Sequence, residues 1–183
     1  MNRRLWLWLS GALGVVLAVG LYWFQPWQLW TNETVQEAVP VAAAATSPPS
    51  TAQPSAPQPA PATGPRELAA GTLISHEHRT SGTVRILRTA DGSLVLRLEN
   101  LDTSSGPDVH VWLTDAPVKP GKDGWDVFDD GRHHDAGKLK GNKGNQNYPL
   151  PAGTDLAGYT SVSIWCDRFD VSFGAAELAT GGA

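Results

Sequence analysis

Cys166, the only cysteine of the chain, is the side chain best suited to redox chemistry. It ends a run beginning near Ser161 in which apolar and polar side chains alternate, the period-two pattern of a half-buried strand. Beyond it the apolar positions shift by one residue, so an uninterrupted strand would place Cys166 and Phe169 on opposite faces. We therefore expect a bulge or bend at residues 166–168, a feature that often re-aims a functional side chain.

A single thiol restricts the chemistry that Cys166 can perform. It has no internal disulfide partner, and a sulfenic acid formed on it would need a thiol from another molecule to resolve it. The neighbouring Arg168 favours the thiolate, whereas Asp167 and burial favour the neutral thiol. Three alternatives stay open: a redox-active or ligand thiolate, an inert thiol that packs as a small hydrophobe, and a bridge to a second molecule.

Histidine and aspartate side chains form a second, weaker set of candidates, for metal binding. The set comprises His76, His78, His110, His133, His134, Asp129 and Asp130. Two histidines with Cys166 would resemble a blue-copper ligand set, but the only methionine is Met1, which leaves no axial ligand in the domain. The acidic stretch 123–135 suits calcium, although its spacing differs from the helix-loop-helix calcium site. Exposed histidines and a solvated acidic turn are the plainer interpretation, and the sequence identifies no cofactor.

Motifs of common hydrolases and of covalent haem attachment are missing from the chain. There is no Gly-x-Ser-x-Gly, no His-Glu-x-x-His and no Cys-x-x-Cys-His. These absences disfavour a hydrolase and a covalently bound haem. They leave open whether the protein is an enzyme.

An N-terminal apolar segment predicts attachment to a membrane. Residues 5–24 contain no charged side chain and, at about 1.5 Å per residue, span the roughly 30 Å hydrocarbon core of a bilayer. Arg3 and Arg4 precede this segment and the next basic residue is Arg66, so residues 1–4 are expected in the cytoplasm and the rest outside. We expect a single-pass signal anchor in the cell membrane. A cleaved signal peptide is the alternative, although its apolar core is usually shorter.

Two further segments follow the apolar one. Residues 31–66 are rich in Pro, Ala, Ser and Thr, which predicts a disordered linker that acts as a stalk. Residues 67–180 contain short apolar runs separated by Gly, Asp and Pro, which is typical of an all-β domain. About eight short strands favour an antiparallel β-sandwich or a partly closed barrel. Acidic residues outnumber basic ones here, so nucleic acid is not an expected partner.

Within this domain, Asp91 and Gly92 lie between two alternating runs and predict a hairpin. A two-residue loop would mismatch the apolar faces of the two strands. A three-residue connection with a left-handed Gly92 instead sets Val84 opposite Leu98. We also expect strands at residues 109–114 and near residues 137–140.

Several motifs in a fixed order resemble the DM-thirteen domain, a small β module named for electron transfer and often found beside DOMON domains in animal cell-surface proteins. The motifs are Gly82, Gly106-Pro107-Asp108-Val-His-Val-Trp-Leu113, Gly137-Lys-Leu-Lys-Gly141, Gly144-Asn-Gln146, Tyr148, Leu150-Pro151, Ser163-Ile-Trp-Cys166 and Phe169-Asp-Val-Ser-Phe-Gly174. The resemblance implies an extracellular or periplasmic β-sandwich with Cys166 at the position of the family's proposed redox centre. The chain departs from the animal pattern in lacking a DOMON domain.

The leading hypothesis is therefore a membrane-anchored extracytoplasmic domain with a redox or electron-transfer role through Cys166. Its partner would be an unidentified redox protein or cell-surface protein. The alternative is a non-catalytic cell-surface module that binds protein or glycan, and a third possibility is a metal-binding domain.

Overall fold

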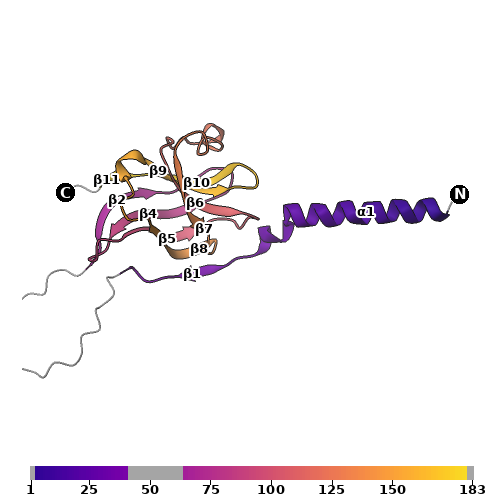
Figure 1. Cartoon of the computed structure of the whole chain (residues 1–183), viewed down its shortest axis with the longest axis horizontal. Coiled ribbons are helices and arrows are strands. Elements are labelled where there is room, and N and C mark those ends of the chain that lie inside the picture. The colour runs from indigo at the N-terminus through magenta and orange to yellow at the C-terminus, as the bar shows by residue number, and fades with distance from the viewer. Residues whose placement is uncertain (1–2, 41–63, 181–183) are drawn as a thin grey trace, which may run out of the picture.

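The computed structural model describes residues 3–40 and 64–180, which form one long helix, three short 3₁₀ helices and eleven strands (Figure 1). The helix α1 spans Arg3–Phe24, and the 3₁₀ helices are η1 (Pro26–Trp30), η2 (Lys122–Gly124) and η3 (Leu156–Gly158). The strands are β1 (Thr34–Gln36), β2 (Arg66–Thr72), β3 (Ile74–Ser75), β4 (Ser81–Arg88), β5 (Leu94–Asp102), β6 (Val109–Thr114), β7 (His133–Lys138), β8 (Lys143–Leu150), β9 (Ser161–Cys166), β10 (Val171–Glu177) and β11 (Ala179–Thr180).

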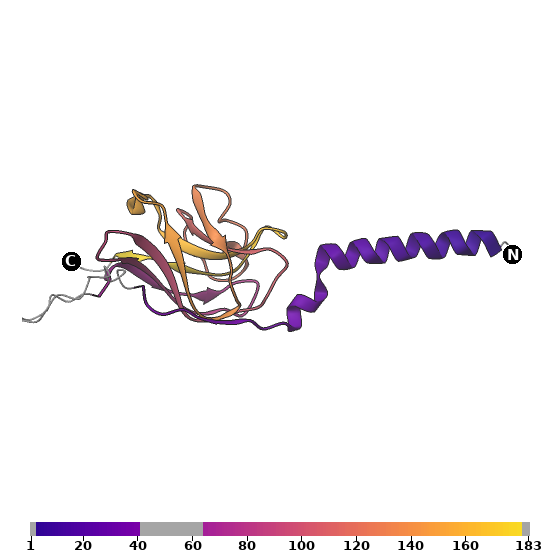
Figure 2. The same cartoon turned by 60° about the horizontal axis from the view of Figure 1, so that its bottom comes forward.

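The strands form two sheets that lie one over the other (Figure 2). One sheet has the order β1-β8-β5-β4-β2-β11, and the other has the order β3-β10-β9-β6-β7. All strand pairs in the described residues are antiparallel except β1 with β8. The sequence predicted about eight strands, whereas the described residues contain eleven, of which β1, β3 and β11 are the shortest. These three have only two or three residues each, too few to leave an alternating pattern.

The main hydrophobic core lies between the two sheets. It joins side chains such as Ile86 and Leu96 from the six-stranded sheet to Val111 and Ile164 from the five-stranded sheet. A second cluster lies on the outer face of the five-stranded sheet, beneath the connection between β6 and β7. Its buried members are Trp112, Ala116, Phe128, Trp165 and Ala175. Strand β9 is therefore buried on both faces along its whole length, where the sequence predicted a half-buried strand.

The hairpin between β4 and β5 confirms the predicted register. Val84 pairs with Leu98 and Ile86 with Leu96. Gly92 has a φ of 87°, the left-handed conformation expected at the end of a three-residue connection. The predicted strand at residues 109–114 coincides with β6, whereas β7 begins at His133, earlier than its sequence pattern indicated.

The sequence predicted a bulge or bend at residues 166–168 to explain the change of apolar phase after Cys166, and the structure has a turn between two strands there, not a bulge within one strand. Strand β9 ends at Cys166, and a tight turn over residues 167–170 reverses the chain into β10. Val171 then pairs with Cys166, so both side chains face the main core. A positive φ of 48° at Asp170 completes the turn. The only register shift between these two strands lies further on, between Ser172 and Gly174.

Helix α1 is long and apolar enough to cross a membrane by length and composition, and none of its apolar window is buried. It projects from one end of the two-sheet domain (Figure 1). Three contacts join its last turn to the turn between β9 and β10. The Arg168 Nη1 donates a hydrogen bond of 2.9 Å to the Trp23 carbonyl oxygen, and its guanidinium lies 5.1 Å from the Trp23 ring centroid. The rings of Phe24 and Phe169 stack with centroids 6.0 Å apart.

The expected linker at residues 31–66 differs from the structure at both of its ends. Thr34–Gln36 forms β1 at the edge of the six-stranded sheet, in parallel register with β8, and Arg66 already begins β2. Residues 41–63 lie outside the described residues. The chain therefore passes from α1 into the sheet within a few residues, and the β domain begins directly beyond the helix.

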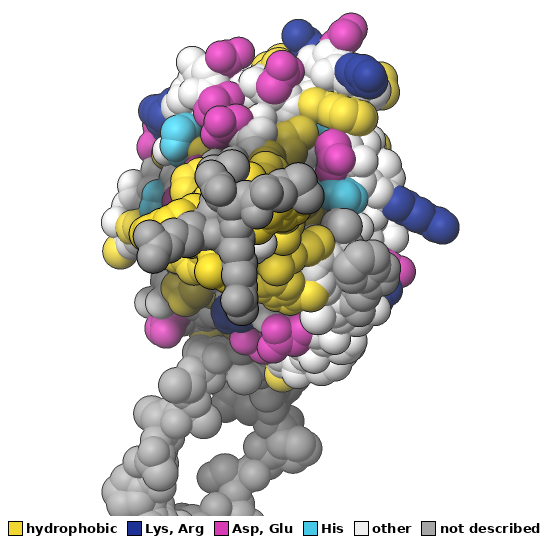
Figure 3. All heavy atoms as spheres, turned by 90° about the vertical axis from the view of Figure 1, so that its right-hand side faces the viewer, with side chains coloured by type: hydrophobic (Ala, Val, Ile, Leu, Met, Phe, Trp, Pro, Cys, Tyr) yellow, Lys and Arg dark blue, Asp and Glu magenta, His cyan; other side chains and the backbone are white. Residues whose placement is uncertain are grey.

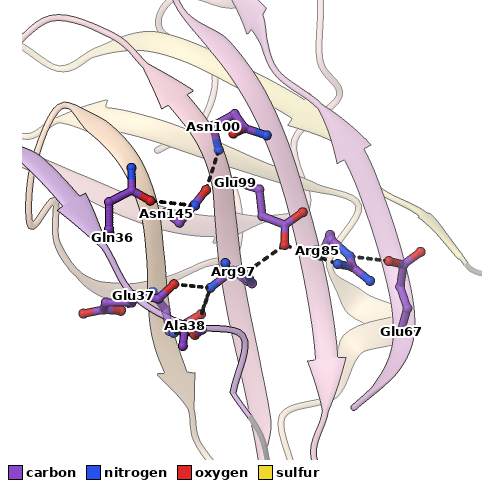
Figure 4. A network of polar contacts seen from close by, with 10 residues as sticks. Gln36, Glu37, Ala38, Glu67, Arg85, Arg97, Glu99, Asn100 and Asn145 are labelled. Atoms are coloured by element: carbon purple, nitrogen blue, oxygen red, sulfur yellow. Dashed lines mark hydrogen bonds and ion pairs between the residues drawn. The ribbon is translucent and has the colours of Figure 1, made fainter. Parts of the chain in front are cut away.

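A polar network fixes β1 and the residues after it to the six-stranded sheet (Figure 4). The Arg97 side chain is 4% exposed and donates hydrogen bonds to the carbonyl oxygens of Glu37 and Ala38, at 3.1 and 3.2 Å. It also forms an ion pair of 2.7 Å with Glu99, which in turn contacts Arg85 at 3.2 Å. A buried guanidinium needs several acceptors, and the β1 segment supplies two of them.

Candidate functional site

Cys166 lies at the end of β9 that is closest to α1, with its side chain between the two sheets. It is paired in register with Val109 of β6 on one side and Val171 of β10 on the other. Its exposed fraction is 0%, and it belongs to the main core cluster. The sulfur is a free thiol. Strand β9 therefore ends at the buried Cys166, and the tight turn at residues 167–170 follows it directly.

Two opposing influences act on the thiol. Burial raises the pKa of Cys166 above its usual value, and the nearby Asp108 carboxylate adds to the rise. The backbone N–H groups of Arg168, Phe169 and Asp108 act in the opposite direction, because they stabilise negative charge on sulfur. Burial dominates, so the resting side chain is the neutral thiol.

Asp108 connects this buried sulfur to a polar cluster on the surface. Its carbonyl oxygen accepts a hydrogen bond of 2.9 Å from the Asp167 N–H, and its carboxylate forms an ion pair of 2.7 Å with Lys138. The same carboxylate lies 3.2 Å from His110 Nε2, and His110 Nδ1 lies 2.8 Å from Asp135 Oδ2. The hydrogen bond with Lys138 is the main reason that the pKa of Asp108 falls below its usual value.

Sequence reasoning missed this role of Asp108. The Gly106-Pro107-Asp108 motif is typical of a tight turn into a strand, and in the sequence it contributed only to the family resemblance. A signal was nevertheless present, because Asp108 and His110 are two residues apart and share one face of a strand. The glycine of the motif is also constrained, since a Cβ at Gly106 would lie 2.7 Å from Val109 Cγ2 and 2.9 Å from Phe173 Cζ.

The candidate metal ligands are dispersed over the domain. His76 is buried, with Nδ1 2.9 Å from Ser172 Oγ. His78 forms an ion pair of 2.6 Å with Glu77, and its ring meets that of Phe173 edge-on at 4.0 Å. His133 stacks on Trp112 with centroids 4.2 Å apart.

The remaining candidates, His134, Asp129 and Asp130, lie in or after the connection between β6 and β7. Across residues 3–40 and 64–180, no group of three or more His, Cys, Asp or Glu side chains is placed to hold a metal ion. His110 lies on the outer face of the five-stranded sheet, opposite to the face of Cys166, so the two do not form a copper-like ligand set.

A cavity of about 640 Å³ opens at the end of the domain where Cys166 lies. Its walls come from the end of α1 and the residues after it, the segment after β3, the loop before β6, Trp125 of the connection between β6 and β7, the turn before β10 and the start of β10. The side chains of Val171 and Phe173 line this cavity and also pack in the main core cluster that contains Cys166. The thiol is thus separated from the cavity by a wall of side chains from the same cluster.

Comparison with known families identifies the domain. The family model described as "Electron transfer DM13" matches residues 72–178, which include every strand from β3 to β10 and the whole surroundings of Cys166. No curated protein and no solved structure matches the chain significantly. The matched region leaves out α1 and β1 and covers more than half of the chain. This chain therefore belongs to the electron transfer DM13 family.

Proposed function

We propose that the protein is a membrane-anchored electron-transfer protein whose β-sandwich domain lies outside the cytoplasm, directly against the membrane. Membership of the electron transfer DM13 family is the observation that carries the redox role. The length and apolar composition of α1 support the anchor, and the two arginines at its start support the orientation. The short connection between α1 and β1 supports the close approach to the bilayer.

Cys166 is the proposed redox centre, because it carries the only thiol of the protein. The backbone N–H groups of Arg168, Phe169 and Asp108 partly offset the effect of burial on the pKa of Cys166 and would favour a sulfur that gains negative charge. Burial holds the thiol neutral at rest and keeps it from indiscriminate oxidation. A partner would reach it from the cavity end, where the strand terminates.

The test measures oxidation of Cys166 in the folded full-length protein. The protein is treated with hydrogen peroxide, sulfenic acid is trapped with a dione reagent, and modified Cys166 is quantified by mass spectrometry. We expect trapping at a rate that exceeds the rate of global unfolding measured under the same conditions. A Cys166→Ser variant, which should fold normally, is the matched control. Modification that occurs only as fast as the domain unfolds would refute a redox role for this cysteine.

A second function, a non-catalytic module that binds a protein or glycan at the cell surface, is favoured by one observation. Cys166 is sealed in the core, where a cysteine also serves well as a small hydrophobe. In that case Cys166→Ser would leave partner binding intact, whereas replacing Trp125 would weaken it. The opposite pattern would eliminate the binding module.

A further inference from the structure

The cavity at the end of the domain combines an apolar wall with an unusual number of aromatic rings. Phe24, Trp125, Phe169 and Phe173 line it, together with the imidazole of His78. Seen end-on along α1, the apolar side chains of the helix stand in front of the centre of this end of the domain, and charged side chains and histidines lie around it (Figure 3). Its volume of about 640 Å³ falls in the range of small-molecule sites.

The position of the cavity relative to the helix indicates where a guest would come from. Phe24 is the last residue of α1, and Gln25, Pro26 and Gln28, which follow it directly, form part of the wall. If α1 spans the bilayer as proposed, these residues lie at the level of the lipid headgroups. The cavity then opens where a molecule dissolved in the hydrocarbon core meets water.

The lining favours a flat ring over a flexible hydrocarbon chain. Aromatic side chains pack favourably on planar guests in offset or edge-to-face geometry. A saturated chain has no ring and gains no stability from these geometries. Polar groups are also present at the wall. His78 Nε2 contacts the Glu77 carboxylate at 2.6 Å, and in the protonated ring the Nδ1–H remains to donate a hydrogen bond to a carbonyl group. The Trp125 indole N–H lacks a hydrogen-bond acceptor among the described residues.

We propose that this cavity binds the ring of a quinone dissolved in the bilayer, with the ring among the aromatic side chains and a carbonyl oxygen beside His78. The inference deepens the proposed function, on which it rests for the anchor and for the redox class of the guest. Quinones combine a planar ring, hydrogen-bond-accepting carbonyl groups and an apolar tail. The aromatic wall favours the ring, the polar groups at the wall favour the carbonyl oxygens, and the location at the membrane favours the apolar tail. Val171 and Phe173 would separate the bound ring from Cys166.

Binding can be measured by fluorine NMR on the full-length protein in lipid nanodiscs, with its eight tryptophans replaced by fluorotryptophan. The probe is a decyl-tailed benzoquinone, and decylbenzene with the same tail is the comparison ligand. Resonances are assigned from single Trp→Phe variants. We expect the Trp125 resonance to shift and saturate with the quinone. Trp112 and Trp165, on the outer face of the five-stranded sheet, should stay unchanged and so report an intact fold.

Two variants test the proposed contacts. Phe169→Asp places a charge at the exposed mouth, and we expect the quinone affinity to fall by at least about ten-fold. His78→Ala removes a hydrogen-bond donor, and we expect a fall of roughly three- to ten-fold. Asp129→Asn, a change in the acidic loop away from the cavity lining, is the matched control and should leave the affinity unchanged.

Three outcomes would overturn the proposal. Equal saturating shifts with decylbenzene would mean an unselective apolar cavity that takes lipid chains. Linear shifts of all tryptophans, including Trp6 and Trp8 of α1, would mean partitioning into the bilayer only. An unchanged Trp125 resonance would mean that no quinone binds there. None of these measurements involves oxidation of Cys166. Failure of quinone binding can therefore be distinguished from failure of the thiol redox role.

Discussion

The outer faces of the two sheets are covered in opposite ways. The six-stranded sheet carries a row of alternating charges, Glu67, Arg85, Glu99 and Arg97, and the β1 segment is tied over one end of it through Arg97 (Figure 4). The five-stranded sheet carries stacked aromatic rings beneath the connection between β6 and β7. The β1 segment lies outside the family-matched region and leads to α1, whereas Arg85, Arg97, Glu99 and the aromatic cover lie inside it. The comparison teaches that one face is completed by apolar packing within the family domain, and the other by charged side chains that also hold a segment from outside it.

The largest expected effect is on the aromatic side. Trp165 is fully buried and stacks on Trp112 with centroids 5.0 Å apart, so Trp165→Ala should lower the free energy of unfolding by about 4 kcal/mol. Denaturant unfolding followed by circular dichroism measures the change. Phe169→Ala, at an exposed ring in the turn, is the control and should cost less than about 1 kcal/mol. Equal losses for the two variants would contradict an energetic role for the aromatic cover.

The next effect concerns the charged side. Arg97→Ala removes a buried guanidinium and should lower the free energy of unfolding by about 3 kcal/mol. It should also release the β1 segment, detected as faster amide hydrogen exchange at Val35 and Gln36, whose strand pairs with β8. Arg85→Ala is the matched control, because that side chain is 32% exposed and its loss should cost about 1 kcal/mol or less. Unchanged amide hydrogen exchange at Val35 and Gln36 in the Arg97→Ala protein would contradict a role of Arg97 in holding β1 to the sheet.

Acid should destabilise the aromatic side first. Burial lowers the pKa of His76 below 6.5, so the folded state favours the neutral imidazole. The resulting stability is fully present above pH 6.5 and is lost as the pH falls through the lower folded-state pKa. His76→Gln should therefore flatten the dependence of the unfolding midpoint on pH just below 6.5. The same slope in both proteins would show that another group is responsible.

The charged side should respond at lower pH. Burial alone would raise the pKa of Glu99, but its contacts with Arg97 and Arg85 bring the value below 4.5. That contribution is present above pH 4.5 and is lost as the pH falls through the folded-state pKa. Comparing Glu99→Gln with the unmodified protein between pH 5 and the acid transition checks it. If the His76→Gln protein still began to lose stability near pH 6, the pH ranges of the two faces would overlap. That result would contradict the distinction between them.

The sequence predicted best those elements whose pattern is local. Strand β6 and the register of β4 with β5 follow from alternating side chains and from the left-handed Gly92. Strand β7 was placed too late, because His133 and His134 begin an edge strand that faces water and leaves no apolar alternation. The family was identified from motifs spread over the whole domain, and the family model confirms it.

The parts that escaped prediction depend on contacts between distant segments. Strand β1 contains one apolar residue, Val35, and forms because of contacts with segments distant in the chain. Its partner β8 lies 109 residues away, and Arg97 lies 60 residues from the carbonyl group of Glu37 that it contacts. The burial of Cys166 depends on the six-stranded sheet, which a single-strand pattern does not contain. The role of Asp108 depends on the turn after β9, which brings Asp167 and the sulfur to its backbone.

The brevity of the junction between α1 and β1 sets a limit on where the domain can work. Residues 25–33 separate the two elements, and even a fully extended chain of that length reaches only about 30 Å. In a chain anchored as proposed, the domain would diffuse in two dimensions with its cavity end toward the lipid, and its effective concentration near other bilayer components would be high. A reaction partner would have to present its own site within a few nanometres of the membrane surface.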